Sequence, residues 1–168
     1  MPPQLIFLTH LILGYVACLL CFVAYIWPKL RSMERAKAHH IIATVHSFRF
    51  FGLVFLLPGV VGAGLPQGFA RAAAIGDFAT GVLALLALVT YSVRPIYWLF
   101  VTAFNLVGAA DLVLAYYHAV RLGLPELSGQ LGAAYVIPVI YVPMLMITHA
   151  VALYWLIQRR SVEERQYA

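Results

Sequence analysis

Apolar runs of about twenty residues recur along the whole chain, separated by short turn-forming stretches. A run of this length matches the hydrocarbon core of a bilayer, which an α-helix crosses in roughly 20 residues. Within lipid a helix satisfies its backbone hydrogen bonds internally, so consecutive runs favour helices over open sheets. The pattern therefore predicts an all-α, polytopic membrane protein built as a helical bundle.

Composition supports this interpretation, because 64% of the 168 residues are hydrophobic and only 10% are charged. Charged residues make up about a quarter of a typical soluble domain. The net charge of +5 arises mainly in short segments between the runs, where basic residues orient a membrane protein, so it does not indicate nucleic-acid binding. We expect a single transmembrane domain over residues 1–168, with the lipid bilayer as its partner.

Five transmembrane helices are predicted from the runs and the Pro- and Gly-containing turns between them. Their approximate bounds are 5–27, 41–63, 71–92, 96–118 and 132–157. Basic residues concentrate after the first span, after the third span and in the tail, and by the positive-inside rule these segments are cytoplasmic. The distribution predicts an outside N-terminus and a cytoplasmic C-terminus, in the cytoplasmic (inner) membrane of a bacterium.

Ionisable side chains within the spans indicate where a functional site lies, because an intramembrane charge is costly and usually faces the bundle interior. The only two aspartates, Asp77 and Asp111, both fall within spans. A rise of about 1.5 Å per residue places both in the outer half of the bilayer. The same reckoning gives an outer tier that also contains His10 and His118, and an inner tier of His46, Arg49 and His149. We expect a few helical turns of apolar packing between the two tiers.

Small residues share a helical face with each aspartate. Gly81 lies about one turn after Asp77, and Gly108 lies about one turn before Asp111. Small side chains let helices approach closely in lipid. The aspartates are therefore expected on packing faces inside the bundle.

Haem b is the first cofactor that these residues suggest, because membrane cytochromes hold haem between histidines on facing helices. On the inner side His46 and His149 form a candidate pair of metal ligands. On the outer side His10 and His118 form a second candidate pair. Arg49 is placed to neutralise a haem propionate. On this interpretation the protein is an electron-transfer membrane subunit.

Proton-linked transport of a small solute or ion is the second interpretation. Two carboxylates and a histidine at one depth can pass protons or hold a cation. If Asp77 and Asp111 come close together, their repulsion makes them share a proton. The chain is small for a transporter, so a homo-oligomer or a larger membrane complex is expected to supply the rest of the path.

A membrane enzyme acting on a lipid-like substrate is the third interpretation, and whether the chain is an enzyme stays open. Asp77 and Asp111 would then be catalytic, with His10 and His118 completing a ligand set for a hard or borderline metal. Such a centre needs an open coordination position for an activated water. The sequence has no HExxH or similar compact motif.

A purely structural role is the fourth interpretation. Arg49 would pair with Asp77 or Asp111 if the spans tilt. His46 would bond Ser47 or a backbone carbonyl. Hydrogen bonds between transmembrane helices are worth only about 0.6 kcal/mol on average, so polar groups at depth need not be catalytic.

Overall fold

The computed structural model is all-helical. It describes the backbone of residues 1–166 and the side chains of residues 1–158, and no strand is present in this part of the chain. Five stretches are long and apolar enough to cross a membrane: Pro3–Arg31, Arg35–Leu56, Gln67–Val89, Arg94–Arg121 and Ile137–Gln158. The predicted all-α fold and the predicted number of candidate spans are confirmed.

Three of these stretches change helical pitch along their length. The first consists of α1 (Pro3–Cys21), a π-helical turn η1 (Phe22–Ile26) and α2 (Trp27–Arg31). The second joins α3 (Arg35–Ser47) to a 3-10 helix, η2 (Phe48–Leu56). The third and fourth, α4 (Gln67–Val89) and α5 (Arg94–Arg121), are uninterrupted. A 3-10 segment η3 (Ser128–Tyr135) and a π-helical turn η4 (Ile137–Tyr141) lead into α6 (Val142–Gln166).

Three predicted span boundaries differ clearly from the helical stretches. The second stretch begins at Arg35 rather than at residue 41, and at the other two boundaries the backbone leaves the helical region. The second stretch ends at Leu56 rather than at residue 63. Pro58 cannot donate a backbone hydrogen bond, and Gly59 adopts a φ of 84°. The last stretch begins at Ile137 rather than at residue 132, because Gly132 adopts a φ of 53° and interrupts the helix there.

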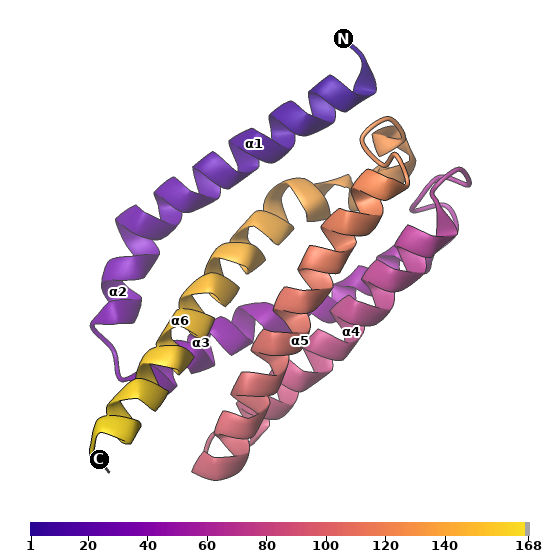
Figure 1. The fold of residues 1–168 in the computed structure, drawn as a ribbon. Coiled ribbons are helices and arrows are strands. Elements are labelled where there is room, and N and C mark those ends of the chain that lie inside the picture. Colours follow the sequence, from indigo (N-terminus) through magenta and orange to yellow (C-terminus); the bar gives the residue numbers. More distant parts are fainter. Residues whose placement is uncertain (167–168) are drawn as a thin grey trace.

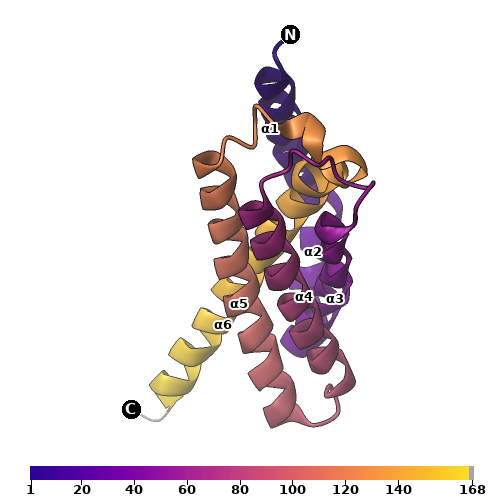
Figure 2. The same ribbon diagram turned by 90° about the vertical axis from the view of Figure 1, so that its right-hand side faces the viewer.

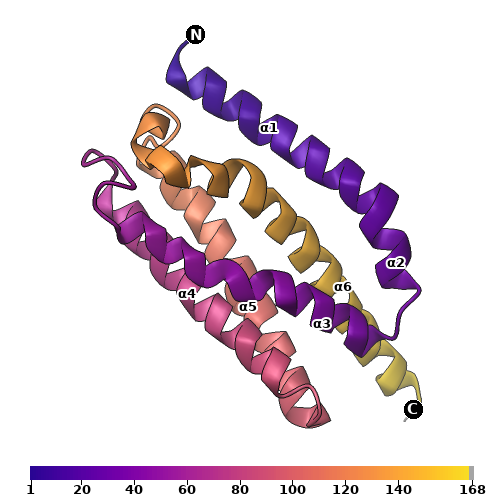
Figure 3. The same ribbon diagram turned by 180° about the vertical axis from the view of Figure 1, so that it is seen from behind.

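The helix α4 packs closely against two neighbours. The α3–η2 stretch contacts it on one side and α5 on the other, while α6 contacts α3 and α5 (Figure 3). The helix α1 packs mainly along η4 and α6 and stands apart from the α4–α5 pair (Figure 1). The start of α1 and the far end of α6 lie at opposite ends of the bundle, as an odd number of crossings requires (Figure 2).

Small residues allow this close packing around α4. A Cβ placed on Gly81 would lie 2.8 Å from the backbone nitrogen of Phe50, so the backbone of η2 runs directly against α4. Ala84 and Ala87, further along α4, are fully buried. The packing face predicted around Asp77 is therefore present.

Apolar side chains form two core clusters, one toward each end of the bundle. The first includes Ile42, Ala84, Phe104 and Trp155, and the second includes Phe55, Ala73, Leu131 and Val139. On α3–η2, on α4 and along the stretch from η4 into α6, the buried residues of one cluster are separated from those of the other by the predicted polar positions. The fold thus leaves one polar layer between two apolar cores.

Candidate functional site

The arginine and both aspartates meet in this polar layer. Arg49, on η2, donates through Nε to Asp77 Oδ1 on α4 at 2.7 Å and through Nη2 to Asp111 Oδ2 on α5. The side chain of Arg49 is completely buried, and those of Asp77 and Asp111 are 11% and 13% exposed. One guanidinium therefore joins three helical stretches through charged hydrogen bonds, which are stronger than neutral ones.

The prediction of two separate polar tiers is wrong. The predicted spans begin too late, because α3 starts at Arg35 and α4 starts at Gln67. Arg49 and Asp77 consequently lie deeper from their own ends than predicted, and they reach the same level. The pairing of Arg49 with an aspartate, expected for a structural role, is present with both aspartates.

His149 extends this arrangement to α6. Arg49 Nη1 donates to His149 Nε2 at 3.3 Å and to the carbonyl oxygen of Gly108 at 3.2 Å. A guanidinium has no acceptor, so His149 accepts through Nε2 and donates through Nδ1 to Asn105 Oδ1 at 3.0 Å. Asn105 donates in turn to the carbonyl of Val101 at 2.8 Å. We refer to Arg49, Asp77, Asp111 and His149 as the charged cluster.

His46 lies against the charged cluster without joining its hydrogen bonds. Its ring centroid is 4.0 Å from that of His149, and its Nε2 is 2.9 Å from Thr148 Oγ1. The same Thr148 hydroxyl lies within hydrogen-bonding distance of the carbonyls of Met144 at 2.9 Å and Leu145 at 3.0 Å. The buried Nδ1 of His46 has no partner among the described residues. The two touching rings leave no space for a porphyrin, so haem ligation by this pair requires α3 and α6 to move apart.

The outer histidines lie away from the charged cluster. His10 Nδ1 is 2.9 Å from the hydroxyl of Tyr135, where α1 meets η3, and His118 packs edge-on against Tyr117. In the described part of the chain no hydrogen bond or ring contact links them to each other or to the aspartates. Within the same residues no three His, Cys, Asp or Glu side chains are grouped to hold a metal ion.

Three glycines make room for the charged cluster. A Cβ on Gly52 would collide with the carboxylate of Asp77. One on Gly76 would collide with the carboxylate of Asp111, and one on Gly108 would crowd the guanidinium and the imidazole. The roles of Gly52 and Gly76 are missed by the sequence analysis. The available signal was local, because Gly52 follows Arg49 by three residues and Gly76 directly precedes Asp77.

An apolar cavity of about 100 Å³ opens beside both carboxylates. Its walls come from α1, η2, α4, α5 and the beginning of the last stretch, and they include Phe7, Leu11, Phe69 and Leu112. Between α1 and α5, the hydroxyls of Tyr15 and Tyr116 form a hydrogen bond of 2.8 Å. We refer to this space as the carboxylate cavity.

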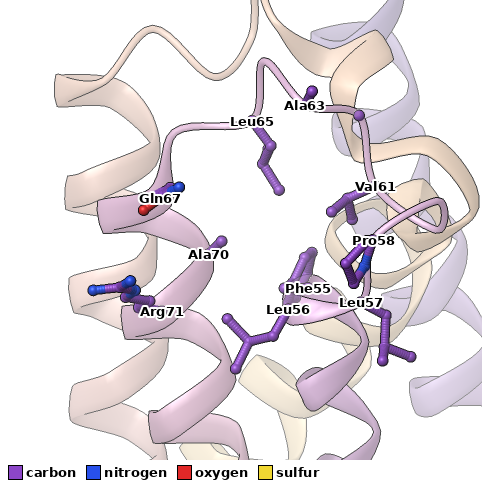
Figure 4. A pocket seen from close by; sticks show the side chains of 11 residues that line it. Phe55, Leu56, Leu57, Pro58, Val61, Ala63, Leu65, Gln67, Ala70 and Arg71 are labelled. Atoms are coloured by element: carbon purple, nitrogen blue, oxygen red, sulfur yellow. The ribbon is translucent and has the colours of Figure 1, made fainter.

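A second cavity of about 310 Å³ lies beneath the loop that joins η2 to α4 (Figure 4). Leu65 points into it, whereas the side chain of Arg71 points away from its centre. Its lining is mostly apolar, and Gln67 and Arg71 are its polar members.

A family model matches most of the chain. The family is described as a domain of unknown function (DUF8737), and the match extends over residues 6–157. This range contains all of the charged cluster and the lining of the carboxylate cavity. No curated protein and no solved structure matches the chain.

Proposed function

The chain belongs to the DUF8737 family, and we propose that it is a membrane protein that transports a small solute or ion. During transport its charged cluster takes up and releases a proton or another cation. In this proposal, Asp77 and Asp111 are the residues that bind and release the proton or cation. Arg49 holds the two carboxylates at one point in the bundle.

The balance of charge carries this proposal. One guanidinium faces two carboxylates, so the fully ionised cluster has one negative charge in excess. No other ion pair reaches these carboxylates among the described side chains. An uncompensated charge in an apolar interior is costly, and carboxylates that share a site hold a proton between them. Binding of one proton or one monovalent cation makes the cluster neutral, and release restores its charge.

Each carboxylate keeps one oxygen that Arg49 does not use. Asp77 Oδ2 lies beside Gly52, and Asp111 Oδ1 lies beside Gly76. Both residues line the carboxylate cavity and retain some exposure. These oxygens are the positions at which a proton or cation would bind.

The membrane setting and the orientation belong to the same proposal. Many large apolar side chains on the five candidate spans are exposed. At the start of α3, Arg35 lies over the ring of Trp155, with its guanidinium carbon 4.3 Å from the centroid, and Trp27 stacks on Trp155 at 5.5 Å. Basic and aromatic residues of this kind are typical of a cytoplasmic interface. They support a bacterial cytoplasmic membrane and an N-terminus outside.

The haem and metal-enzyme interpretations have less support. His46 and His149 already touch, so a haem between them needs a rearrangement. His10 and His118 lie apart from the aspartates, so the ligand set of a metal enzyme is not assembled.

Infrared difference spectroscopy of the purified protein in lipid tests the proposed exchange. A protonated carboxyl band should disappear as the pH is raised, and Asp111→Asn should remove this change because its cluster is permanently neutral. Glu34→Gln is the matched control, since Glu34 pairs with exposed Arg94 at 3.3 Å, outside the cluster. A pH-dependent band that persists in both Asp77→Asn and Asp111→Asn would contradict the proposal.

Flux measurements complete this test. Vesicles that contain the protein and an internal pH-sensitive dye are given an opposing gradient of Na⁺ or K⁺. With the wild type or Glu34→Gln, a gradient of one of these cations or of a solute should drive protons across the membrane in the opposite direction. With Asp77→Asn or Asp111→Asn it should not.

A further inference from the structure

We propose that the carboxylate cavity binds a small hydrophobic amine in its ammonium form, which enters from the lipid side and displaces the proton held by the aspartates. This inference rests on the proposed function, and it names the class of solute that the transporter carries.

The accessible lining of the cavity is almost entirely apolar, and Asp77 and Asp111 stand at its edge. The walls include Phe7, Leu11 and Leu112, and the acidic groups are Asp77 and Asp111. No lysine, arginine or histidine lies in the lining. An alkyl chain would be removed from water against the walls, while the ammonium group would meet the unpaired carboxylate oxygens.

The net charge of the cluster favours an ammonium ion over an anionic or a neutral ligand. Arg49 makes three hydrogen bonds within the charged cluster and a fourth to the carbonyl of Gly108, and its side chain is completely buried, so it is not free to bind an anion. A carboxylate ligand would add to an existing negative excess, and a neutral alcohol would leave that excess unchanged. An ammonium ion removes it, as a proton does. Because either ion neutralises the cluster, the two compete, and one proton should leave for each amine bound.

The size and position of the cavity restrict the amine further. An apolar cavity of about 150 Å³ holds benzene, so the observed volume of about 100 Å³ suits a short alkyl chain. The α1 wall is the part best placed to admit it, because α1 belongs to the least buried of the five stretches. The α1 backbone packs mainly along η4 and α6. Entry between α1 and α5 would pass the hydrogen bond between Tyr15 and Tyr116.

Calorimetric titration of the protein in detergent tests this inference. The probes are n-butylammonium, n-butanol and butyrate, which share a chain and differ in charge. Titration in two buffers of different ionisation enthalpy counts the protons released. We expect n-butylammonium to bind with release of about one proton, and the other two probes not to bind. Asp111→Asn should weaken the binding of n-butylammonium about ten- to hundredfold, as expected for loss of a charged hydrogen-bond partner.

A matched pair of variants locates the binding. Ala115 lines the cavity on α5, whereas Ala110 lies exposed on the same helix and outside the cavity. Ala115→Leu should block n-butylammonium while leaving the pH-dependent carboxyl band in place, and Ala110→Leu should leave binding unchanged.

Three results would overturn the inference: butanol binding as tightly as the amine, amine binding without proton release, or equal binding by both alanine variants. If n-butylammonium fails to bind while the carboxyl band still titrates, the amine inference falls and the proposed exchange stands. If the amine binds and releases a proton but no flux occurs in vesicles, the site stands and transport falls.

Discussion

Two regions of this molecule bury histidines, and different forces hold them together. In the charged cluster every contact of Arg49 is a directional hydrogen bond to a fixed acceptor. At the start of α3 the histidines instead pack among rings: His39 lies 5.3 Å from Trp98, and His40 lies 4.5 Å from Tyr91, between centroids. We refer to Trp27, His39, His40, Tyr91, Tyr97, Trp98 and Trp155 as the aromatic cluster.

The difference concerns how much each region depends on a single side chain. Loss of one partner from a buried ion pair leaves a charge that neither lipid nor packed protein can solvate. Loss of one ring contact removes packing from one of several neighbours, each worth about 0.5–1.5 kcal/mol beyond its buried area. The charged cluster is therefore expected to fail as a unit, and the aromatic cluster to weaken in steps.

Arg49→Met should have the largest effect. It leaves Asp77 and Asp111 facing each other without a cation, and breaking a buried pair in this way costs about 3–5 kcal/mol. Denaturant unfolding followed by circular dichroism measures the loss. The triple variant that adds Asp77→Asn and Asp111→Asn removes every charge and should recover much of the stability. Equal stabilities for Arg49→Met and the wild type would show that the cluster does not hold the helices together.

Gly108→Ala should have the next largest effect. The added methyl would lie 2.5 Å from His149 Nε2 and 2.6 Å from Arg49 Nη1. Overpacking of this kind costs about 1–3 kcal/mol. The control is Gly68→Ala on α4, where a Cβ meets Leu122 Cδ1 at an ordinary 3.8 Å and alanine favours the helix. The same unfolding measurement should give opposite signs for the two variants, and matching signs would argue against a tightly filled cluster.

Tyr97→Phe tests the aromatic cluster. The Tyr97 hydroxyl donates to the carbonyl of Ala36 at 2.6 Å, and its ring packs edge-on against Tyr91 at 5.1 Å. The variant keeps the ring and loses one hydrogen bond, so the free energy of unfolding should fall by about 1 kcal/mol. A loss as large as that of Arg49→Met would remove the distinction between the two clusters.

Glu34→Gln should have the smallest effect. Its partner Arg94 is 49% exposed and Glu34 is 66% exposed at the side chain. Exposed pairs of this kind contribute about 0.2–1 kcal/mol at most, and salt weakens them further. Its unfolding midpoint should match the wild type, which is why this variant serves as the control for the aspartates.

The fold could be predicted from sequence because hydrophobic run length fixes how often a chain can cross a bilayer. The pitch changes in η1, η2 and η4 could not be predicted, since local apolar composition does not distinguish helix types. For the candidate site, the sequence singles out Arg49, Asp77, Asp111 and His149 as polar groups at depth. It does not predict that they meet, because this depends on the true start of α3 and α4.

His10 and His118 show what cannot be predicted by counting residues along a helix. Counting residues along a helix gives the depth of a side chain, and it gives nothing about which neighbour the helix turns toward. His10 faces Tyr135 and His118 faces Tyr117, although their depths suited a shared site with the aspartates. Helix rotation about its own axis is set by packing partners, which a single sequence does not reveal.

The 3-10 pitch of η2 makes its length part of the site. The buried residues of η2 are Arg49, Gly52 and Phe55, and a 3-10 helix repeats every three residues, so they form one straight row toward α4. Insertion of one residue after Arg49 would turn the rest of this row by about 120°. Phe51 would then take the place of Gly52 beside the Asp77 carboxylate. The spacing from 49 to 55 should therefore resist insertions and deletions as strongly as the charged residues resist substitution.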